Sequence, residues 1–409
     1  MKNSSEQIVS NTVPESLTNT RFYSDHQLII AALLVGIAST CMFIGVSANA
    51  LLYVILQRYL DMQWGKGFVI AAYFVPAIIG NRVFDAIVQR RSPAVLASGA
   101  ALMTAAMFIL QSVSIQSWQT MLLTRVVQGL CVGIFVPAVM ILGRQALAKR
   151  GESAFGIFSL CIPLASIMGP GIAEYLLLRS DVFHLFIVLA IFCTIAAILL
   201  ITSNNLLRRS TKEPVLQKPS ANIHMEESCH ISRHRQLFLI GSISIGVAGN
   251  LISLFIAPKV ISDHLSSGLF FLCATITLVI ARVAMTFFPA IRFGSDAIPL
   301  LSAGLLASVL LAFAPVSHAF VLLGAVGFGF FHAMLFPKLI FLSKSNSSSH
   351  VYRHIGNMNL IIALCGFSIS IVIGALNDHF NVGTLGIVIS TSILIGILLF
   401  QITLRLIRQ

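Results

Sequence analysis

Apolar residues dominate twelve segments of the chain, and each segment is long enough to cross a lipid bilayer as a helix. The hydrocarbon core of a bilayer needs about 20 consecutive, mostly apolar residues. Such runs lie near residues 28–52, 67–89, 93–113, 118–143, 154–177, 182–203, 236–258, 266–289, 297–316, 319–342, 355–377 and 382–404. The first run is too long for the apolar part of a secretory signal peptide, so we expect it to be a transmembrane helix. The pattern predicts an all-α membrane protein with twelve transmembrane helices.

A single long polar stretch inside the chain divides these segments six and six. Residues 204–235 contain two prolines and several charged side chains, which is typical of a flexible linker. We therefore predict an N-terminal six-helix bundle over 28–203 and a C-terminal six-helix bundle over 236–404. The tails, 1–27 and 405–409, and the linker are expected in the cytoplasm.

The two predicted bundles share residues at a nearly constant spacing. The stretch Ile44–Asn49 (IGVSAN) recurs 201 positions later as Ile245–Asn250 (IGVAGN). A spacing of 200 relates further matches in later spans, namely Arg82-Val83 with Arg282-Val283, Gly129 with Gly329, Pro137 with Pro337 and Gly156 with Gly356. This recurrence predicts two six-helix units related by a parallel repeat.

Basic residues are distributed unevenly between alternate loops. With the N-terminus placed in the cytoplasm, eighteen Lys and Arg residues fall in cytoplasmic segments, and the outer loops contain only four, Arg58, Lys66, Arg179 and Lys259. Cytoplasmic loops of membrane proteins carry such an excess. We therefore expect both termini inside. The short loops and the lack of appended domains favour a bacterial inner membrane.

Composition excludes several classes of protein. Of the 409 residues, 57% are apolar and 10% are charged, whereas a soluble domain has about 25% charged residues. This composition excludes a soluble enzyme and a nucleic-acid-binding domain. The net charge of +12 does not indicate a polyanionic partner, because most of the bases lie in short loops between apolar runs. The cysteines show no zinc-type spacing, and the histidines of the linker are a weak metal candidate, so we expect no metal and no cofactor.

The fourth span contains Arg125, Gln128 and Gly129, followed by Pro137. Together with the twelve spans, the duplication and the central linker, this R-x-x-Q-G pattern resembles the major facilitator superfamily of secondary transporters. The resemblance implies a role for the arginine in proton coupling. A guanidinium inside a span is costly and tends to face the bundle interior or an aqueous cavity, where it could hold an anion. A structural arginine that bonds backbone carbonyls is the alternative.

The fifth span contains Gly169, Pro170 and Gly171. This stretch is similar to the G-x-x-x-G-P-x-x-G motif of the exporting, antiport-type branches of that family, although Ala165 and Ala173 replace flanking glycines. Small residues permit close helix approach, and a proline bends a helix where the two halves must move. A gating role and a simple packing kink both stay open here, as they do for the helix-interior prolines at 137 and 337.

The loop between spans two and three keeps only a degenerate form of the family's G-x-x-x-D-R-x-G-R-R motif, over residues 80–91. In that region Arg82 and its match Arg282 lie on spans two and eight. The pair could converge on a central cavity and hold one anion, as in the family's nitrate porters, whose glycine-rich signature is absent here. Alternatively, both arginines extend to the inner interface or latch an inner gate.

Few titratable side chains lie inside the spans. Proton coupling would have to use Glu174, Asp85 or His332, since spans one and seven offer only Asn49 and Asn250. His332 could titrate near neutral pH, but a packing histidine is equally consistent with the pattern. If the protein exchanges substrate against substrate, no proton carrier is needed.

We therefore expect two facing six-helix bundles and a secondary transporter that works by alternating access. Three intramembrane arginines against few acids favour an anionic or carboxylate-bearing small molecule, such as an organic acid, an amino-acid conjugate or a carboxylate siderophore. Proton-coupled export by antiport is preferred. Uptake of an anionic nutrient, or a transporter-like sensor or scaffold, is the alternative. We expect no enzymatic activity and no ATP-driven pumping, because no clustered catalytic set or phosphate-binding loop occurs. The expected partners are the substrate, protons and the bilayer, but no nucleic acid, and the expected state is a monomer.

Overall fold

In the computed structural model of the chain, the described residues are 15–52, 55–56, 66–88, 90–147, 158, 160–210, 228–262, 265–287, 294–314, 317–342, 348–376 and 381–406. The first half contains α1 (Glu15–Ser47), η1 (Ala48–Leu51), α3 (Lys66–Ala71), α4 (Phe74–Ile87), α5 (Pro93–Val113), α6 (Trp118–Leu147), α8 (Cys161–Arg179) and α9 (Val182–Ser210). The second half contains α10 (Ser228–Ser262), α11 (Ser267–Phe287), η4 (Ser295–Ala297), α12 (Ile298–Phe313), α13 (His318–Phe341), α14 (Ser348–Leu376) and α15 (Val382–Leu406).

These helices account for twelve membrane crossings. Within the described residues, nine segments are long and apolar enough to span a bilayer, and one of them, Gly67–Ile87, combines α3 and α4. The apolar helices α12 and α15 and the helix α8 supply the remaining three. Large apolar side chains such as Leu178 (79% exposed) and Leu300 (70% exposed) point outward, as expected of a surface in contact with lipid. The predicted all-α class with twelve transmembrane helices is confirmed.

Two helices extend beyond the predicted boundaries of the linker. Helix α9 continues to Ser210, and α10 begins at Ser228, so both reach into the segment 204–235. Residues 211–227 lie outside the described part of the chain. Most of the N-terminal tail also lies outside it, although α1 already begins at Glu15. The division into domains at these positions stays a prediction.

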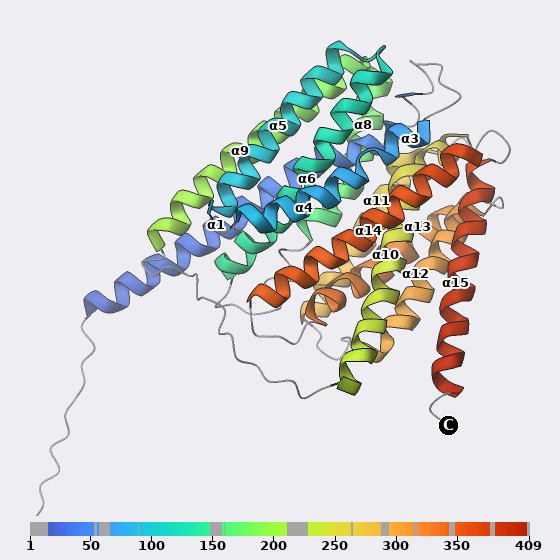
Figure 1. Cartoon of the computed structure of the whole chain (residues 1–409). Coiled ribbons are helices and arrows are strands. Elements are labelled where there is room, and N and C mark those ends of the chain that lie inside the picture. Colours follow the sequence, from blue (N-terminus) through green and yellow to red (C-terminus); the bar gives the residue numbers. More distant parts are fainter. Residues whose placement is uncertain are drawn as a thin grey trace, which may run out of the picture.

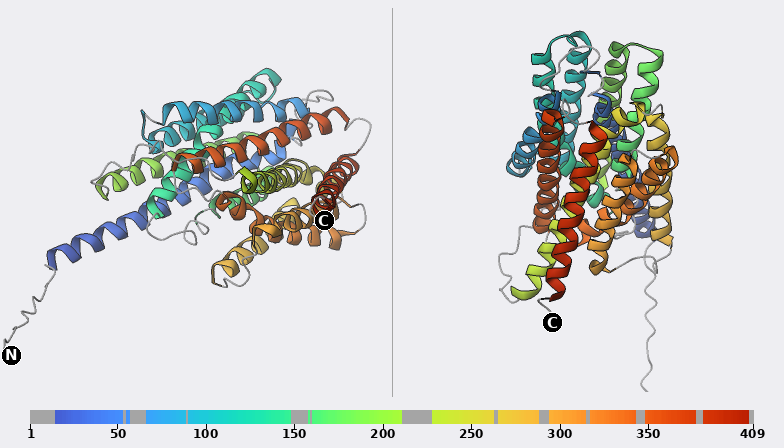
Figure 2. Two further views of the ribbon diagram at one scale, coloured as in Figure 1. Left: turned by 60° about the horizontal axis from the view of Figure 1, so that its bottom comes forward. Right: turned by 90° about the vertical axis from the view of Figure 1, so that its right-hand side faces the viewer.

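The two halves of the chain form separate helix bundles that lie side by side (Figure 1). In the first half, α1 packs on α8, α4 on α6, and α5 on α6 and α9. The second half repeats this arrangement, with α10 on α14, α11 on α13, and α12 on α13 and α15. The helices of the two halves converge at the end that holds α3 and spread apart toward the end where α9 finishes and α10 begins (Figures 1 and 2).

Contacts at glycines give the register of the repeat. A Cβ atom on Gly129 of α6 would lie 2.0 Å from the carbonyl oxygen of Tyr73, and a Cβ on Gly329 of α13 would lie 2.2 Å from that of Ala274. The absence of a side chain therefore lets the same two helices approach closely in each half. Tyr73 lies in the short break between α3 and α4, directly before Phe74, and it corresponds to Ala274 at a spacing of 201.

The last helix of each half begins with an equivalent cap. Asp181 Oδ1 accepts a hydrogen bond from the backbone N–H of His184 at 3.0 Å, and Asn381 Oδ1 accepts one from that of Thr384 at 2.8 Å. These side chains satisfy N–H groups that a helix N-terminus leaves unpaired. The bonds from His184 also lower the pKa of the Asp181 carboxyl group. The caps are 200 positions apart and support the duplication.

The close approach at Gly129 leads to a stability prediction. The Gly129→Ala variant is expected to have a free energy of unfolding about 2 kcal/mol lower, because the added Cβ must push α6 away from α4. It should therefore unfold at a lower temperature. Thermal unfolding in detergent measures this change. The matched control is Gly99→Ala in α5, where a Cβ would meet nothing within 4 Å. This variant should be as stable as the unmodified protein or slightly more stable. Equal melting temperatures for both variants would contradict the prediction.

Candidate functional site

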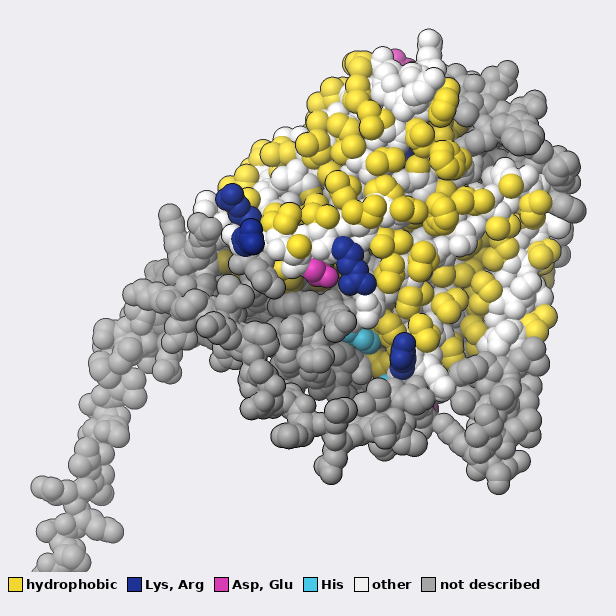
Figure 3. Space-filling view, in the orientation of Figure 1, with side chains coloured by type: hydrophobic (Ala, Val, Ile, Leu, Met, Phe, Trp, Pro, Cys, Tyr) yellow, Lys and Arg dark blue, Asp and Glu magenta, His cyan; other side chains and the backbone are white. Residues whose placement is uncertain are grey.

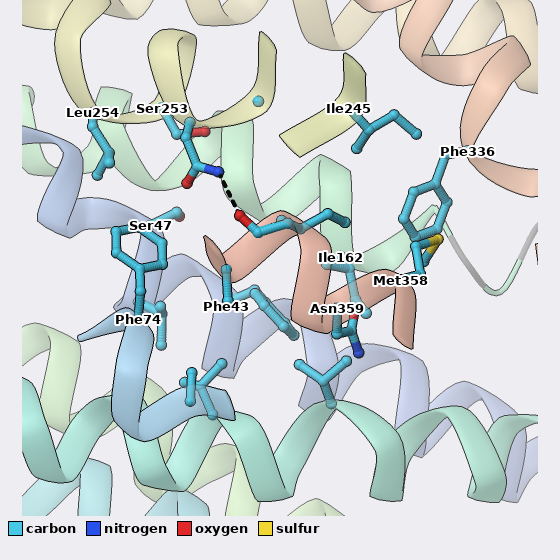
Figure 4. A pocket seen from close by; sticks show the side chains of 18 of the residues that line it. Phe43, Ser47, Phe74, Ile162, Ile245, Ser253, Leu254, Phe336, Met358 and Asn359 are labelled. Atoms are coloured by element: carbon cyan, nitrogen blue, oxygen red, sulfur yellow. Dashed lines mark hydrogen bonds between the residues drawn. The ribbon is translucent and has the colours of Figure 1, made fainter. Parts of the chain in front are cut away.

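A cavity of about 310 Å³ lies between the two bundles. Helices α1, α4, α6 and α8 line it from the first half, and α10, α11, α13 and α14 line it from the second. In Figure 4, Phe43, Ser47 and Phe74 of the first half lie near Ser253 and Leu254 of the second. The volume of the cavity is at the lower end of the range of small-molecule sites, about 300–1,000 Å³. Both bundles would therefore contact a bound molecule.

The cavity walls are mostly apolar and strongly aromatic. Six aromatic rings line it, three from each half: Phe43, Tyr73, Phe74, Phe271, Phe328 and Phe336. The polar lining residues are two serines, three asparagines, one histidine and one arginine, namely Ser47, Ser253, Asn81, Asn250, Asn359, His332 and Arg125. Among the described residues that line the cavity, none is an aspartate or a glutamate. The fixed charge of this described lining is therefore positive.

Arg125 provides that charge, and polar and aromatic neighbours hold its side chain in place. Its Nη1 donates a hydrogen bond to Gln128 Oε1 at 3.2 Å, and Gln128 Nε2 donates to Gln111 Oε1 of α5 at 3.3 Å. The guanidinium carbon lies 4.6 Å from the centre of the Tyr73 ring. The residue is only 2% exposed, its Nε has no hydrogen-bond partner, and it pairs with no carboxylate among the described residues. An incoming anion could supply the missing partner.

The second half contributes neutral polar groups. The His332 ring lies between those of Phe328 and Phe336, with ring centres 5.5 and 5.7 Å away. His332 Nδ1 and Asn359 Nδ2 are buried and have no hydrogen-bond partner. Asn250, by contrast, donates to the carbonyl oxygens of Gly246 at 2.6 Å and Ile362 at 3.1 Å. Asn359 and His332 are therefore available to a bound molecule, and the Asn250 amide is already engaged.

One end of the cavity is closed by contacts between the bundles. Glu174 Oε2 of α8 accepts hydrogen bonds from Ser267 Oγ at 2.5 Å and from the backbone N–H of Gly268 at 2.6 Å, at the first turn of α11. Nearby, α3 and α14 approach so closely that a Cβ on Gly67 would lie 2.5 Å from the Cα of Gly374. We call the end of the molecule that contains these residues the closed end.

Comparisons with known proteins match this architecture. The sequence matches the profile of the family described as Major Facilitator Superfamily over residues 33–375. This chain belongs to the Major Facilitator Superfamily. Among solved structures, the human organic anion transporter MFSD10 (TETRAN) superposes with a TM-score of 0.66 and 14% identity, covering 91% of this chain and 99% of that one. The nucleoside transporter NupG gives 0.61 and 13%, covering 90% of this chain and 98% of that one. Among curated proteins, none matches the sequence significantly.

The sequence-predicted site residues of this superfamily member fall into three groups. Arg125, His332 and Asn250 line the cavity, and Gln128 supports Arg125 from within α6. Glu174 is at the closed end. Arg82 and Asp85 are exposed and outside the cavity lining, the Asn49 side chain lies outside the described part, and Arg282 is buried with its guanidinium 6.0 Å from the Phe336 ring.

The predicted hinge residues lie at helix contacts. Pro137 and Pro337 are buried inside α6 and α13. A Cβ on Gly169 would lie 2.0 Å from Ser47 Oγ, so this glycine allows α8 to pack closely on α1. Pro170 is buried beside it, and Gly171 faces Gly268 of the other bundle. Whether any of them acts as a hinge stays a prediction.

The packing register corrects the expected equivalence of Arg82 and Arg282. At the spacing of 201 that relates α4 to α11, Arg282 corresponds to Asn81, and Arg82 corresponds to the exposed Val283. The outward-facing residues agree with this register, since Val75 and Ile79 are exposed, as are their counterparts Ile276 and Ile280. The spacing of 200 read from the sequence is one residue short in this span.

Sequence reasoning missed several cavity residues. Tyr73, Asn81 and Asn359 were not singled out, although the Oδ1 of Asn81 is also buried without a partner. For the two asparagines the available signal was an uncharged polar residue inside an apolar span. Tyr73 offered no comparable signal, because an aromatic residue in a transmembrane helix is common at many positions.

The contact at the closed end gives a further prediction. The Gly67→Val variant is expected to slow transport about tenfold, because the new side chain prevents α3 and α14 from meeting. Access to the cavity from this end is reported by labelling of a cysteine that replaces Ser253 in a background lacking the native cysteines. The rate of this labelling should be higher with Gly67→Val than without it. Gly396→Ala, where a Cβ would meet nothing within 4 Å, is the control. Unchanged labelling would contradict a role of this contact in closure.

Proposed function

We propose that this protein is a secondary active transporter that moves a small anionic, carboxylate-bearing molecule across the cytoplasmic membrane by alternating access. One observation carries the proposal: Arg125 lines a cavity between the two bundles, is almost fully buried, and has no carboxylate partner among the described residues. A buried charge without a partner is costly. A carboxylate substrate would remove that cost, whereas a cation would add to it.

The arrangement of the bundles supports alternating access. Residues of both halves line the cavity, and the described close contacts between the halves at Glu174 and Gly67 lie at one end. Breaking these contacts while the opposite end closes would expose the cavity to the other side of the membrane.

We further propose export coupled to protons, with Glu174 as the proton carrier. Its carboxylate joins the two bundles only while it can accept both hydrogen bonds from the α11 terminus. Protonation would weaken these bonds and favour opening of the closed end. The similarity of the Gly169–Gly171 stretch to the motif of exporting branches supports this direction. His332 is the second candidate carrier, because it lines the cavity.

The distribution of bases supports an orientation with the closed end outside. On the face seen in Figure 3, apolar side chains cover most of the described surface, and Lys and Arg gather at its lower left margin. That margin is on the side where the bundles spread apart, and Arg90 and Arg91 are both exposed. By the positive-inside rule this side faces the cytoplasm. We place the protein in a bacterial inner membrane as a monomer.

Purified protein in liposomes loaded with a pH-sensitive dye tests the proposed function. Organic acids, carboxylate chelators, nitrate and cationic drugs are added in turn, and protein-free liposomes serve as the blank. Proton movement evoked by anions alone is expected, with a direction that distinguishes antiport from symport. A response to cations but not to anions, or silence in both the dye assay and labelled-substrate exchange, would refute the proposal.

A further inference from the structure

The lining of the cavity restricts the substrate more narrowly than its charge does. Six rings surround the space, and three come from each half. Aromatic side chains pack well against flat apolar groups, both by burying area and by edge or face contacts between rings. A compact inorganic anion would leave these rings unused and would contact few residues of the second half. The walls therefore favour a molecule with an aromatic body.

The charges of the lining limit the substrate to one carboxylate. Arg125 is the single Lys or Arg residue among the described cavity lining, and no acid accompanies it. Arg282 is also buried, with its guanidinium carbon 6.0 Å from the Phe336 ring, but it is not among the lining residues. A second carboxylate on the substrate would therefore be transferred from water into the cavity without a cation in its described lining, which is strongly unfavourable. An ammonium group would lack a carboxylate in the same way. Polycarboxylates and zwitterions are therefore disfavoured.

Unpartnered polar atoms on the walls indicate one more requirement. Asn81 Oδ1, Asn359 Nδ2 and His332 Nδ1 are buried and have no hydrogen-bond partner, and all three residues line the cavity. Buried polar groups are normally paired, and leaving them unpaired is costly. A hydroxyl or an amide on the substrate would satisfy at least one of them. These atoms come from both bundles, whereas the guanidinium comes from the first.

We propose that the cavity takes an amphiphilic monocarboxylate with an aromatic body and one neutral hydrogen-bonding group, as in N-acylated aromatic amino acids and hydroxyaryl acids. The carboxylate binds Arg125, the ring packs among the six aromatic side chains, and the neutral group bonds to Asn359. This substrate class rests on the proposed function, since it presupposes transport of an anion.

Exchange of labelled compounds by proteoliposomes tests the substrate class with matched molecules. N-Benzoylglycine has the ring, the amide and one carboxylate, 4-phenylbutanoate lacks the amide, and N-benzoylglycinamide lacks the charge. We expect N-benzoylglycine to half-saturate exchange at a concentration about fivefold to tenfold lower than 4-phenylbutanoate. The uncharged amide, citrate, nitrate and benzyltrimethylammonium should not exchange.

A pair of asparagine variants tests the role of Asn359. Asn359→Leu is expected to remove the difference between N-benzoylglycine and 4-phenylbutanoate while retaining exchange of the latter, which shows that the variant is folded. Asn357→Leu is the control, because Asn357 is on the same helix, is exposed and does not line the cavity. Phe336→Leu should weaken the binding of both compounds, which raises the concentration that half-saturates exchange. Phe287→Leu, at a residue 72% exposed, should change neither concentration.

The outcomes separate this inference from the proposed function. Exchange of citrate or nitrate, without exchange of the aromatic acids, would overturn the substrate class and leave an anion transporter. Retention of the difference in Asn359→Leu would overturn the assignment of the neutral group. If cations alone exchange, or if no anion does, the proposed function fails and the substrate class fails with it.

Discussion

The Arg125→Gln variant is expected to transport the proposed anionic substrate on the order of 100-fold more slowly than the unmodified protein at low substrate concentration. Truncating one partner of a buried, hydrogen-bonded charge pair costs about 3 kcal/mol, and about 1.4 kcal/mol corresponds to tenfold. Glutamine keeps the size and polarity of the site but removes the charge. Initial rates of labelled-substrate exchange in proteoliposomes measure the loss.

Two further variants distinguish a binding role of Arg125 from a structural one. Arg125→Lys keeps the charge but loses the planar fork, and we expect it to retain part of the activity. Gln128→Ala removes the group that holds Nη1 and should reduce the rate less than Arg125→Gln does. Arg90→Gln, at an exposed position outside the cavity, is the matched control. If Arg125→Gln transports normally while remaining folded, the guanidinium does not bind the substrate.

The Glu174→Gln variant is expected to favour the state in which the closed end is open. Hydrogen bonds to a charged acceptor contribute about 1.5–3 kcal/mol each, and a negative charge at a helix N-terminus adds about 0.3–1 kcal/mol. Glu174 is only partly buried, so we expect a net shift of about 2 kcal/mol, or roughly 30-fold in the ratio of the two states.

Distances between spin labels measure this opening. Labels on cysteines that replace Leu178 of α8 and Leu269 of α11 would report the separation of the bundles, because both side chains are exposed near Glu174. Longer distances between the two labels are expected in the Glu174→Gln variant than in the protein that retains Glu174. Asp181→Asn, at an exposed loop position beyond the contact, is the control. Equal distances in the Glu174→Gln variant and in the protein that retains Glu174 would exclude Glu174 as the coupling group.

The sequence was sufficient for the fold but only partly for the site. Spans are predictable because the bilayer requires long apolar helices, and Arg125 was recognisable because a charge inside a span is costly. The inward-facing neutral residues were not, since a helix that is apolar on every side carries no periodic signal for its orientation. Asn81, Tyr73 and Asn359 are of this kind.

Contacts between the bundles were equally inaccessible to sequence reasoning. Glu174 and Ser267 are 93 positions apart, and neither residue type requires the other. Their meeting depends on how two independently packed bundles lie against each other. The sequence comparison assigned Arg82 as the counterpart of Arg282, whereas the packing assigns Asn81. The cause is related, because the sequence alone does not distinguish a spacing of 200 from one of 201, and helix packing does.

Arg125, the single Lys or Arg residue of the described cavity lining, also affects how the membrane voltage would act on the transport cycle. If the walls contribute no negative charge, the empty cavity carries one positive charge, and binding a monocarboxylate makes it neutral. The loaded cavity lining would then contribute no voltage dependence, and only the charge on Glu174 would remain. The return of the empty protein would carry a positive charge through part of the field, worth up to about 2.3 kcal/mol per 100 mV. A potential that is negative inside would accelerate this return after export and oppose it after import, so we expect the resting membrane itself to favour outward transport.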